Sequence, residues 1–249
     1  MTPDLPSRFR SRVPRRERDE GSASSKVCGT VARMDIDPKA IASRDVYRLL
    51  IGGVLPRPIA WVSTIAPDGT PNLAPFSFFT VVCENPPTLC VVPARRGSDG
   101  GRKDTLVNIE ATGEFVVNIV GETLADAMNL SAAAVGPEVD EFALAGLETT
   151  PSVVVRPPRV TLSPVAYECQ LDRIVHVGGE VPGAGSLVLG TVVRIHVADD
   201  AWDNGRILTD VARQIGRGGG DDYIRTTDRF RLARPVVAPD GTITIPPLA

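Results

Sequence analysis

A glycine-rich segment followed by a lysine is the first part of the chain whose residue types suggest chemistry. Loop 97–101 holds three glycines, and Arg102, Lys103, Asp104 and Thr105 follow it directly. Glycines let a backbone approach a ligand closely, and the N-terminus of a helix attracts negative charge. We expect Asp104 or Thr105 to cap such a helix and Lys103 to add positive charge. The segment predicts a phosphate-binding site, with an ordinary solvated loop and helix cap as the alternative.

The spacing in this segment does not suit a nucleoside triphosphate. A P-loop needs Gly, four residues and then Gly-Lys-Ser/Thr, so that the lysine reaches phosphate and the hydroxyl binds magnesium. Here Arg102 stands at the position of the second glycine, and Asp104 stands at that of the hydroxyl. The segment therefore suits the monophosphate of a cofactor bound without a metal.

Other catalytic signatures are missing from the sequence. His176 and His196 fall within strand-like runs, which favours hydrogen-bonded strand residues. There is no Gly-x-Ser-x-Gly elbow and no Gly-x-Gly-x-x-Gly run between a strand and a helix. The acidic doublets 199–200 and 221–222 are typical of solvated loops. The glycine run 216–220 is either a linker or a close backbone approach to a planar ligand. We predict no catalytic side chain.

Composition excludes several classes of partner. The 249 residues are 43% hydrophobic with a net charge of −3, which favours neither nucleic acid nor an anionic membrane. Aromatic residues make up only 5%, too few for a base-stacking surface. No apolar run approaches the ~20 residues of a membrane span. Cys83, Cys90 and Cys169 lie among apolar residues without zinc-like spacing. We therefore predict no metal site, reduced core thiols and a cytoplasmic location.

The pattern of apolar residues and turn residues indicates a mainly β chain. Strands are expected at 59–66, 88–92, 114–120, 164–177 and 186–198, with a return through 72–75 after the turn 67–70. Helices are expected from Asp37-Pro38, from Ser43 to Gly52-Gly53, and at 104–111, 123–133 and 139–145. Strands interrupted by helices without regular alternation fit a Greek-key barrel.

Three regions follow from composition. Residues 1–33 are rich in arginine, serine and acidic residues, and we expect a disordered tail there. Met34 is our hypothesis for the natural start. Residues 34–235 form the expected domain, and 236–249 form a C-terminal extension.

An ordered series of motifs runs along the chain. It includes Asn72-Leu73-Ala74-Pro75-Phe76-Ser77, and in full it comprises 47–64, 68–69, 72–79, 86–87, 103–105, 108–109, 113–118, 139–142, 164 and 190–193. This series resembles the flavin reductase-like family over roughly residues 34–235. The resemblance implies a mainly β, Greek-key split β-barrel with inserted helices. It also implies a homodimer that binds flavin mononucleotide (FMN) near the subunit interface.

The resemblance also assigns residues. It implies phosphate contacts from the strand and the loop identified above, with an arginine nearby: Ser63, Thr64, Lys103, Asp104, Thr105 and Arg57. It implies flavin-ring contacts along Asn72, Ala74, Pro75, Phe76 and Ser77, and a late approach at Gly218. Pro75 has no N–H, which leaves neighbouring groups available to a ligand.

The implied activity is reduction of flavin or a small acceptor by NAD(P)H. A flavin carries such chemistry itself, while the protein binds and orients it. Many family members have Gly-Asp-His shortly before the glycine that corresponds to Gly190, where this chain has Gly183-Ala184-Gly185. An electron-transfer protein without NAD(P)H activity and a non-enzymatic split-barrel module are therefore the alternatives.

Overall fold

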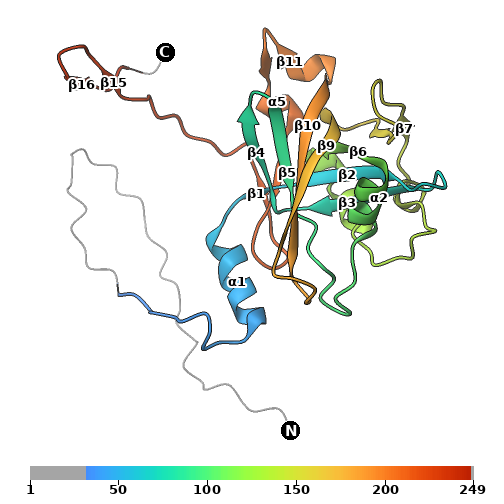
Figure 1. The fold of residues 1–249 in the computed structure, drawn as a ribbon. Coiled ribbons are helices and arrows are strands. Elements are labelled where there is room, and N and C mark those ends of the chain that lie inside the picture. Colours follow the sequence, from blue (N-terminus) through green and yellow to red (C-terminus); the bar gives the residue numbers. More distant parts are fainter. Residues whose placement is uncertain (1–31, 248–249) are drawn as a thin grey trace. The chain divides into compact units, whose positions relative to one another are not determined.

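The computed structural model describes residues 32–247 (Figure 1). Its contacts divide the chain into two compact units, Met1–Ala40 and Ile41–Ala249. The helix expected from Asp37-Pro38 is absent from the described residues, and a turn stands in its place. The Asp37 carboxylate accepts from Lys39 N–H, and the Asp37 carbonyl accepts from Ala40 N–H. The tail predicted at 1–33 lies almost entirely outside the described residues.

One large antiparallel sheet dominates the second unit (Figure 1). Its order is β3-β2-β6-β9-β10-β5-β4. The bounds are β2 Ala60–Ile65, β3 Pro71–Phe76, β4 Phe79–Glu84, β5 Pro87–Val91, β6 Glu114–Ile119, β9 Val165–Val177 and β10 Gly185–Val197. The strand predictions are confirmed within a few residues at each end, whereas β4 is a strand that the sequence does not predict.

The two edges of this sheet are joined by only two residues. β3 ends at Phe76 and β4 begins at Phe79, although these strands lie at opposite ends of the strand order. Consecutive Cα atoms are about 3.8 Å apart, so Ser77 and Phe78 span about 11 Å at most. The sheet must therefore curl until its first and last strands approach each other. The result is a barrel with a seam at Ser77 and Phe78.

The chain at β2 is buried on both faces. Ala60 and Val62 belong to one hydrophobic cluster, while Ile59 and Trp61 belong to another. Successive strand side chains point to opposite faces, so a strand covered on both sides reads as a continuous apolar run. The helical segments are α1 Ser43–Gly53, α2 Asp104–Thr112, η1 Glu122–Leu124, α3 Ala125–Leu130, α4 Glu141–Leu144, η2 Asp199–Ala201 and α5 Thr209–Ala212. Helix α2 packs against β2, and α3 and α4 pack against the neighbouring strand β3.

The start and end of α2 matter for the site. Gly113 has a φ of 72°, a left-handed conformation that ends the helix as the sequence predicts. At the other end Lys103 is the N-cap residue, and no side chain caps the helix. The predicted cap from Asp104 or Thr105 is therefore wrong, because the Thr105 hydroxyl donates to Asn72 instead.

Smaller sheets complete the second unit. A three-stranded sheet has the order β1-β13-β14, and three hairpins lie elsewhere. The bounds are β1 Arg57–Pro58, β13 Ile215–Arg217 and β14 Tyr223–Arg225; β7 Thr149–Thr150 and β8 Arg159–Val160; β11 Trp202–Asp203 and β12 Arg206–Ile207; β15 Val236–Val237 and β16 Ile243–Thr244.

Two of the three described cysteines match the prediction of buried thiols. Cys90 and Cys169 are free and buried, whereas Cys83 is free and exposed. The prediction for Cys83 is wrong because β4 is the last strand in the sheet order and five of its six residues are exposed. Within residues 32–247, no helix combines the length and apolar character needed to cross a membrane.

Candidate functional site

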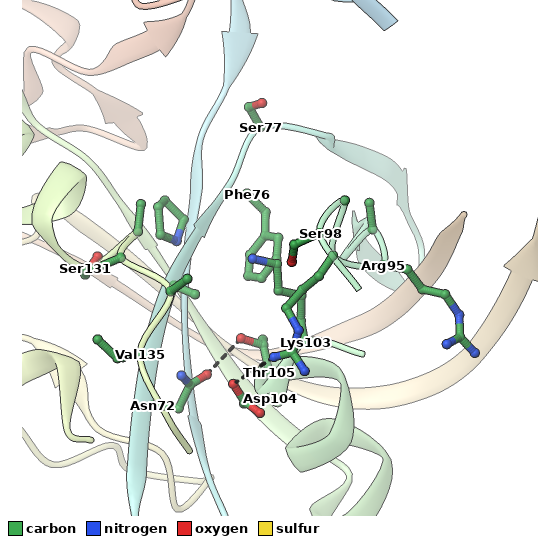
Figure 2. Close-up of a pocket in the computed structure, with 18 of the residues that line it drawn as sticks. Asn72, Phe76, Ser77, Arg95, Ser98, Lys103, Asp104, Thr105, Ser131 and Val135 are labelled. Carbon is green, nitrogen blue, oxygen red and sulfur yellow. Dashed lines mark hydrogen bonds and ion pairs between the residues drawn. The ribbon is translucent and has the colours of Figure 1, made fainter. Parts of the chain in front are cut away.

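A cavity of about 640 Å³ lies along β3 and the start of α2 (Figure 2). Its volume is in the range typical of pockets that hold a cofactor or a drug-sized ligand. We call it the main cavity. Its lining comes from Tyr47, residues 72 and 74–78 of β3 and the seam, 92 and 94–96 after β5, 97–99 of the glycine-rich loop, 103–105, 131–135 and Glu141. Segments distant in sequence therefore meet around one volume.

A buried hydrogen-bond network forms the polar end of the main cavity. Asn72 Oδ1 accepts from Thr105 Oγ1 at 2.8 Å and from Thr64 Oγ1 at 3.3 Å. Asn108 Nδ2 donates to the same Thr64 hydroxyl at 3.0 Å. All four residues are buried. Because buried polar groups must be satisfied, this network fixes the position of Thr105 and Asn72 beside the cavity.

Glu141 holds the other side of Asn72. Its carboxylate accepts from Asn72 Nδ2 at 2.8 Å and from Leu73 N–H at 3.0 Å. Burial raises the pKa of Glu141, these hydrogen bonds oppose the rise, and the charge of Asp104 adds to it. Asn72 therefore cannot flip its amide without losing both this bond and the one from Thr105.

Lys103 brings positive charge to the same end of the cavity (Figure 2). Its carbonyl accepts from Leu106 N–H and Val107 N–H, so the helix begins immediately after it. The first N–H groups of an α-helix lack partners within the helix and carry partial positive charge. Lys103 and the first turn of α2 thus bring positive charge to this end of the cavity, where the carboxylates of Asp104 and Glu141 also lie.

The cavity brings together eight of the residues predicted from the sequence. These are Asn72, Ala74, Pro75, Phe76, Ser77, Lys103, Asp104 and Thr105. Ser77 lies at the end away from Lys103 (Figure 2). The lining thus combines Lys103 and a helix start with the apolar side chains of Ala74, Pro75 and Phe76.

Four predicted residues lie outside the lining of the main cavity. Ser63 Oγ donates to Pro158 O at 2.6 Å. The Thr64 hydroxyl donates to Asn72 Oδ1, so Thr64 supports a lining residue without lining the cavity itself. Arg57 is buried, and its Nη2 donates to the carbonyl of Gly218 at 2.7 Å. Contacts of these residues with a ligand stay predictions.

Several parts of the lining were not predicted from the sequence, among them Tyr47 and Glu141. Arg95 and Arg96 directly precede the glycine-rich loop, and residues 131–135 cover the opposite side. The adjacent arginines before a glycine run were a usable signal, since both add positive charge. Nothing local distinguishes 131–135, because this segment reaches the cavity through the packing of α3.

The two histidines lie on strands, away from the main-cavity lining. His176 Nδ1 hydrogen-bonds Ser186 Oγ at 2.9 Å, and His196 Nε2 hydrogen-bonds Glu168 Oε1 at 2.6 Å. Both fit the prediction of hydrogen-bonded strand residues. The main cavity thus contains no histidine that could act as a base.

Comparison with known proteins decides the family. The family model "Flavin reductase like domain" matches residues 52–219. The chain belongs to the flavin reductase-like family. An uncharacterized protein of Halalkalibacterium halodurans is 38% identical over 206 residues, covering 82% of this chain and 98% of that protein. YwrF of Bacillus subtilis, also uncharacterized, is 35% identical over 198 residues, which cover 78% of this chain and 96% of YwrF.

Solved structures agree with this assignment. Nitrilotriacetate monooxygenase component B from Bacillus cereus is 37% identical with a TM-score of 0.78, covering 82% of this chain and 100% of that one. The 2-nitrobenzoate 2-nitroreductase NbaA of Pseudomonas fluorescens is 34% identical with a TM-score of 0.73, covering 83% and 98%. A Shewanella frigidimarina protein described as a "putative flavin reductase with split barrel domain" has a TM-score of 0.69 at 21% identity, covering 81% of this chain and 100% of that one. The seamed barrel of this member of the family is a split β-barrel.

Proposed function

We propose that the main cavity binds FMN, with its phosphate at Lys103 and Thr105 and its ring along residues 74–77. The observation that carries this is the polarity of the cavity: a lysine and a helix start at one end, and Ser77 beside an apolar wall at the other (Figure 2). A helix N-terminus with a nearby cation suits a phosphate, and this site offers no metal-binding hydroxyl of the P-loop kind.

The proposed activity is that of an FMN-dependent oxidoreductase, which reduces flavin or a small acceptor with electrons from NAD(P)H. When bound, flavin supplies the electron-transfer chemistry, and the protein has to bind it, orient it and leave one face of the ring accessible. Two relatives whose names denote redox enzymes are 37% and 34% identical to this chain. The lack of a histidine in the main cavity is consistent with such a role.

A flavin-binding electron carrier is the second candidate. The observation in its favour is Gly183-Ala184-Gly185, where many family members have Gly-Asp-His. Gly185 stands at the position of the histidine and has no side chain that could hydrogen-bond a nicotinamide.

Anaerobic rapid mixing separates the two candidates. FMN-loaded protein is mixed with NADH or NADPH, and the flavin absorbance band is followed. We expect bleaching with at least one of the two nucleotides. A flavin band that persists with both, but bleaches with dithionite, would remove the reductase activity and leave the electron carrier.

We further propose that the chain works as a cytoplasmic homodimer. Tyr47, Leu50 and Val54 on and beside α1 are exposed, as are Val81 and Val82 on the edge strand β4. Apolar residues gathered on a helix and on an unpaired strand edge are typical of an interface. The free cysteines Cys83, Cys90 and Cys169 are compatible with a reducing compartment.

A further inference from the structure

Two arginines stand opposite each other in a pair of short strands. Arg57 of β1 and Arg217 of β13 are Cα partners in an antiparallel ladder. Like charges directly opposite in such a ladder destabilise it. Burial lowers the pKa of Arg57, Tyr47 opposes this, and the charge of Arg217 lowers the pKa further. The protein therefore maintains an unfavourable arrangement of charge at this place.

Neutral acceptors bind both guanidinium groups. Arg57 is only 5% exposed and donates to the carbonyls of Ile51, Val54 and Gly218. Arg217 Nη2 donates to Gly220 O at 2.7 Å, and its guanidinium lies 4.4 Å from the centroid of the Tyr223 ring.

Neither arginine pairs with an acid. Among residues 32–247, no ion pair joins either of them to a carboxylate. Arg57 is removed from water, and a buried charge is ordinarily paired because desolvation is expensive; Arg217 is partly exposed. Asp221 and Asp222 lie in the turn between β13 and β14, but neither forms an ion pair with these arginines, so the buried Arg57 is suited to a further negative charge from a ligand.

Ser77 links this charge pair to the main cavity. The Nε of Arg57 donates to Ser77 Oγ at 3.3 Å. Because that oxygen accepts from Arg57, the Ser77 hydroxyl is left to donate its own proton elsewhere. Ser77 lines the main cavity and two smaller cavities, of about 280 Å³ beside Arg57 and about 180 Å³ beside Arg217 and Tyr223. It occupies the seam of the barrel, at the end of the main cavity away from Lys103 (Figure 2).

The charge that develops on a flavin matches this arrangement. Adding two electrons and one proton to the neutral oxidised ring leaves one net negative charge on the ring. A nearby positive charge in a partly buried site stabilises the charged form far more than the neutral form. Arg57 and Arg217 would therefore act differently on the two redox states of the same ligand.

We propose that Arg57 and Arg217 form a charge pair that makes the site bind reduced, anionic flavin more tightly than oxidised flavin, with Ser77 as a hydrogen-bond donor positioned by Arg57. This inference rests on the proposed function, since it requires the ring to lie along residues 74–77. The function inferred for the two arginines is to raise the reduction potential of the bound cofactor. For Arg57 it takes the place of the phosphate contact that the family resemblance implies, because Arg57 hydrogen-bonds Ser77 at the end of the cavity away from Lys103.

The test compares dissociation constants for the two redox states. Protein freed of flavin is titrated anaerobically with oxidised FMN and with dithionite-reduced FMN. We expect the Arg217→Gln substitution to raise the dissociation constant of reduced FMN by a factor at least ten times larger than that for oxidised FMN. A tenfold change in this ratio lowers the midpoint potential of the two-electron couple by about 30 mV. Arg217→Lys keeps the charge and should restore most of the ratio.

Arg225→Gln is the matched control. Arg225 lies on the neighbouring strand β14, but it pairs with Glu122, so its loss should leave the ratio unchanged. Arg57→Lys and Arg57→Gln give a second comparison, with the same expected order. If they fail to fold because α1 is released, the Arg217 variants still decide the matter.

Two results would overturn the charge pair. Equal losses of affinity for oxidised and reduced FMN in Arg217→Gln, which leave the ratio of the two dissociation constants unchanged, would indicate a purely structural role. A loss of affinity for FMN with no loss for riboflavin, titrated in the same way, would indicate a phosphate contact. Wild-type protein that binds neither redox form would instead overturn the proposed function, and this inference with it.

Discussion

At the scale of single residues, Lys103 is the group on which the phosphate assignment depends most. It lines the polar end of the main cavity, and no carboxylate forms an ion pair with it within residues 32–247. Thr105 is fixed beside it by the 2.8 Å hydrogen bond to Asn72. A positive charge next to a helix start should distinguish a ligand that carries a phosphate from the same ligand without one.

Replacing Lys103 with alanine should therefore weaken the binding of FMN far more than the binding of riboflavin. The expected loss for FMN is about 1.5–3 kcal/mol, the usual contribution of a hydrogen bond to a charged group. Fluorescence titration of both ligands measures the difference. Arg102→Ala is the neighbouring control, because Arg102 pairs with Glu110 and does not line the main cavity. Equal losses for FMN and riboflavin in Lys103→Ala would show that the phosphate lies elsewhere.

At the scale of elements, a buried carboxylate ties a loop to the barrel. Glu168 of β9 is completely buried and accepts from the N–H groups of Val153, Val154 and Val155 and from His196. Burial by itself raises the pKa of Glu168, but the hydrogen bonds outweigh it and the pKa is lowered. The ionised side chain therefore stabilises the connection between β7 and β8.

Glu168→Gln should reduce the free energy of unfolding by about 1–3 kcal/mol, since its amide group leaves at least one buried N–H without an acceptor. Because the folded pKa lies below the unfolded one, the stabilisation is complete above the ordinary value of 4.5 and is lost as pH falls below it. Urea unfolding at neutral and acidic pH should show the wild type and variant converging in acid. Asp172→Asn, an exposed carboxylate on the same strand, is the control. A difference that persists unchanged into acid would contradict this account.

Much of this element framework could be predicted from local sequence. The turn at 67–70 and the glycine at 113 mark the ends of a strand and a helix, because turn types and left-handed caps depend on a few adjacent residues. Local sequence could not predict the edge strand β4 or the surroundings of Arg57. Both depend on the curling of the sheet, which brings β3 and β4 near each other. Likewise the Thr105 hydroxyl fits a helix cap in sequence, and only the approach of β3 gives it Asn72 as a partner.

At the scale of the whole molecule, the exposed apolar residues of α1 and β4 predict self-association. Leu50 is 60% exposed and Val81 is 69% exposed. Burying such surface against a second copy would release water from apolar area on both chains.

Leu50→Asp combined with Val81→Lys should therefore convert a dimer into monomers. Analytical ultracentrifugation would give twice the mass of one chain for the wild type and the mass of one chain for the variant. Leu232→Asp is the control, because Leu232 is 80% exposed but lies outside both elements. A wild type that sediments as a monomer at every concentration would refute the dimer.

The visible absorption spectrum tests the central claim most directly. The protein is incubated with excess FMN, desalted and examined, with FMN quantified after denaturation. The account predicts a flavin absorbance band shifted from that of free FMN and close to one FMN per chain. A colourless protein that also fails to quench FMN fluorescence would contradict the assignment of the main cavity as a flavin site.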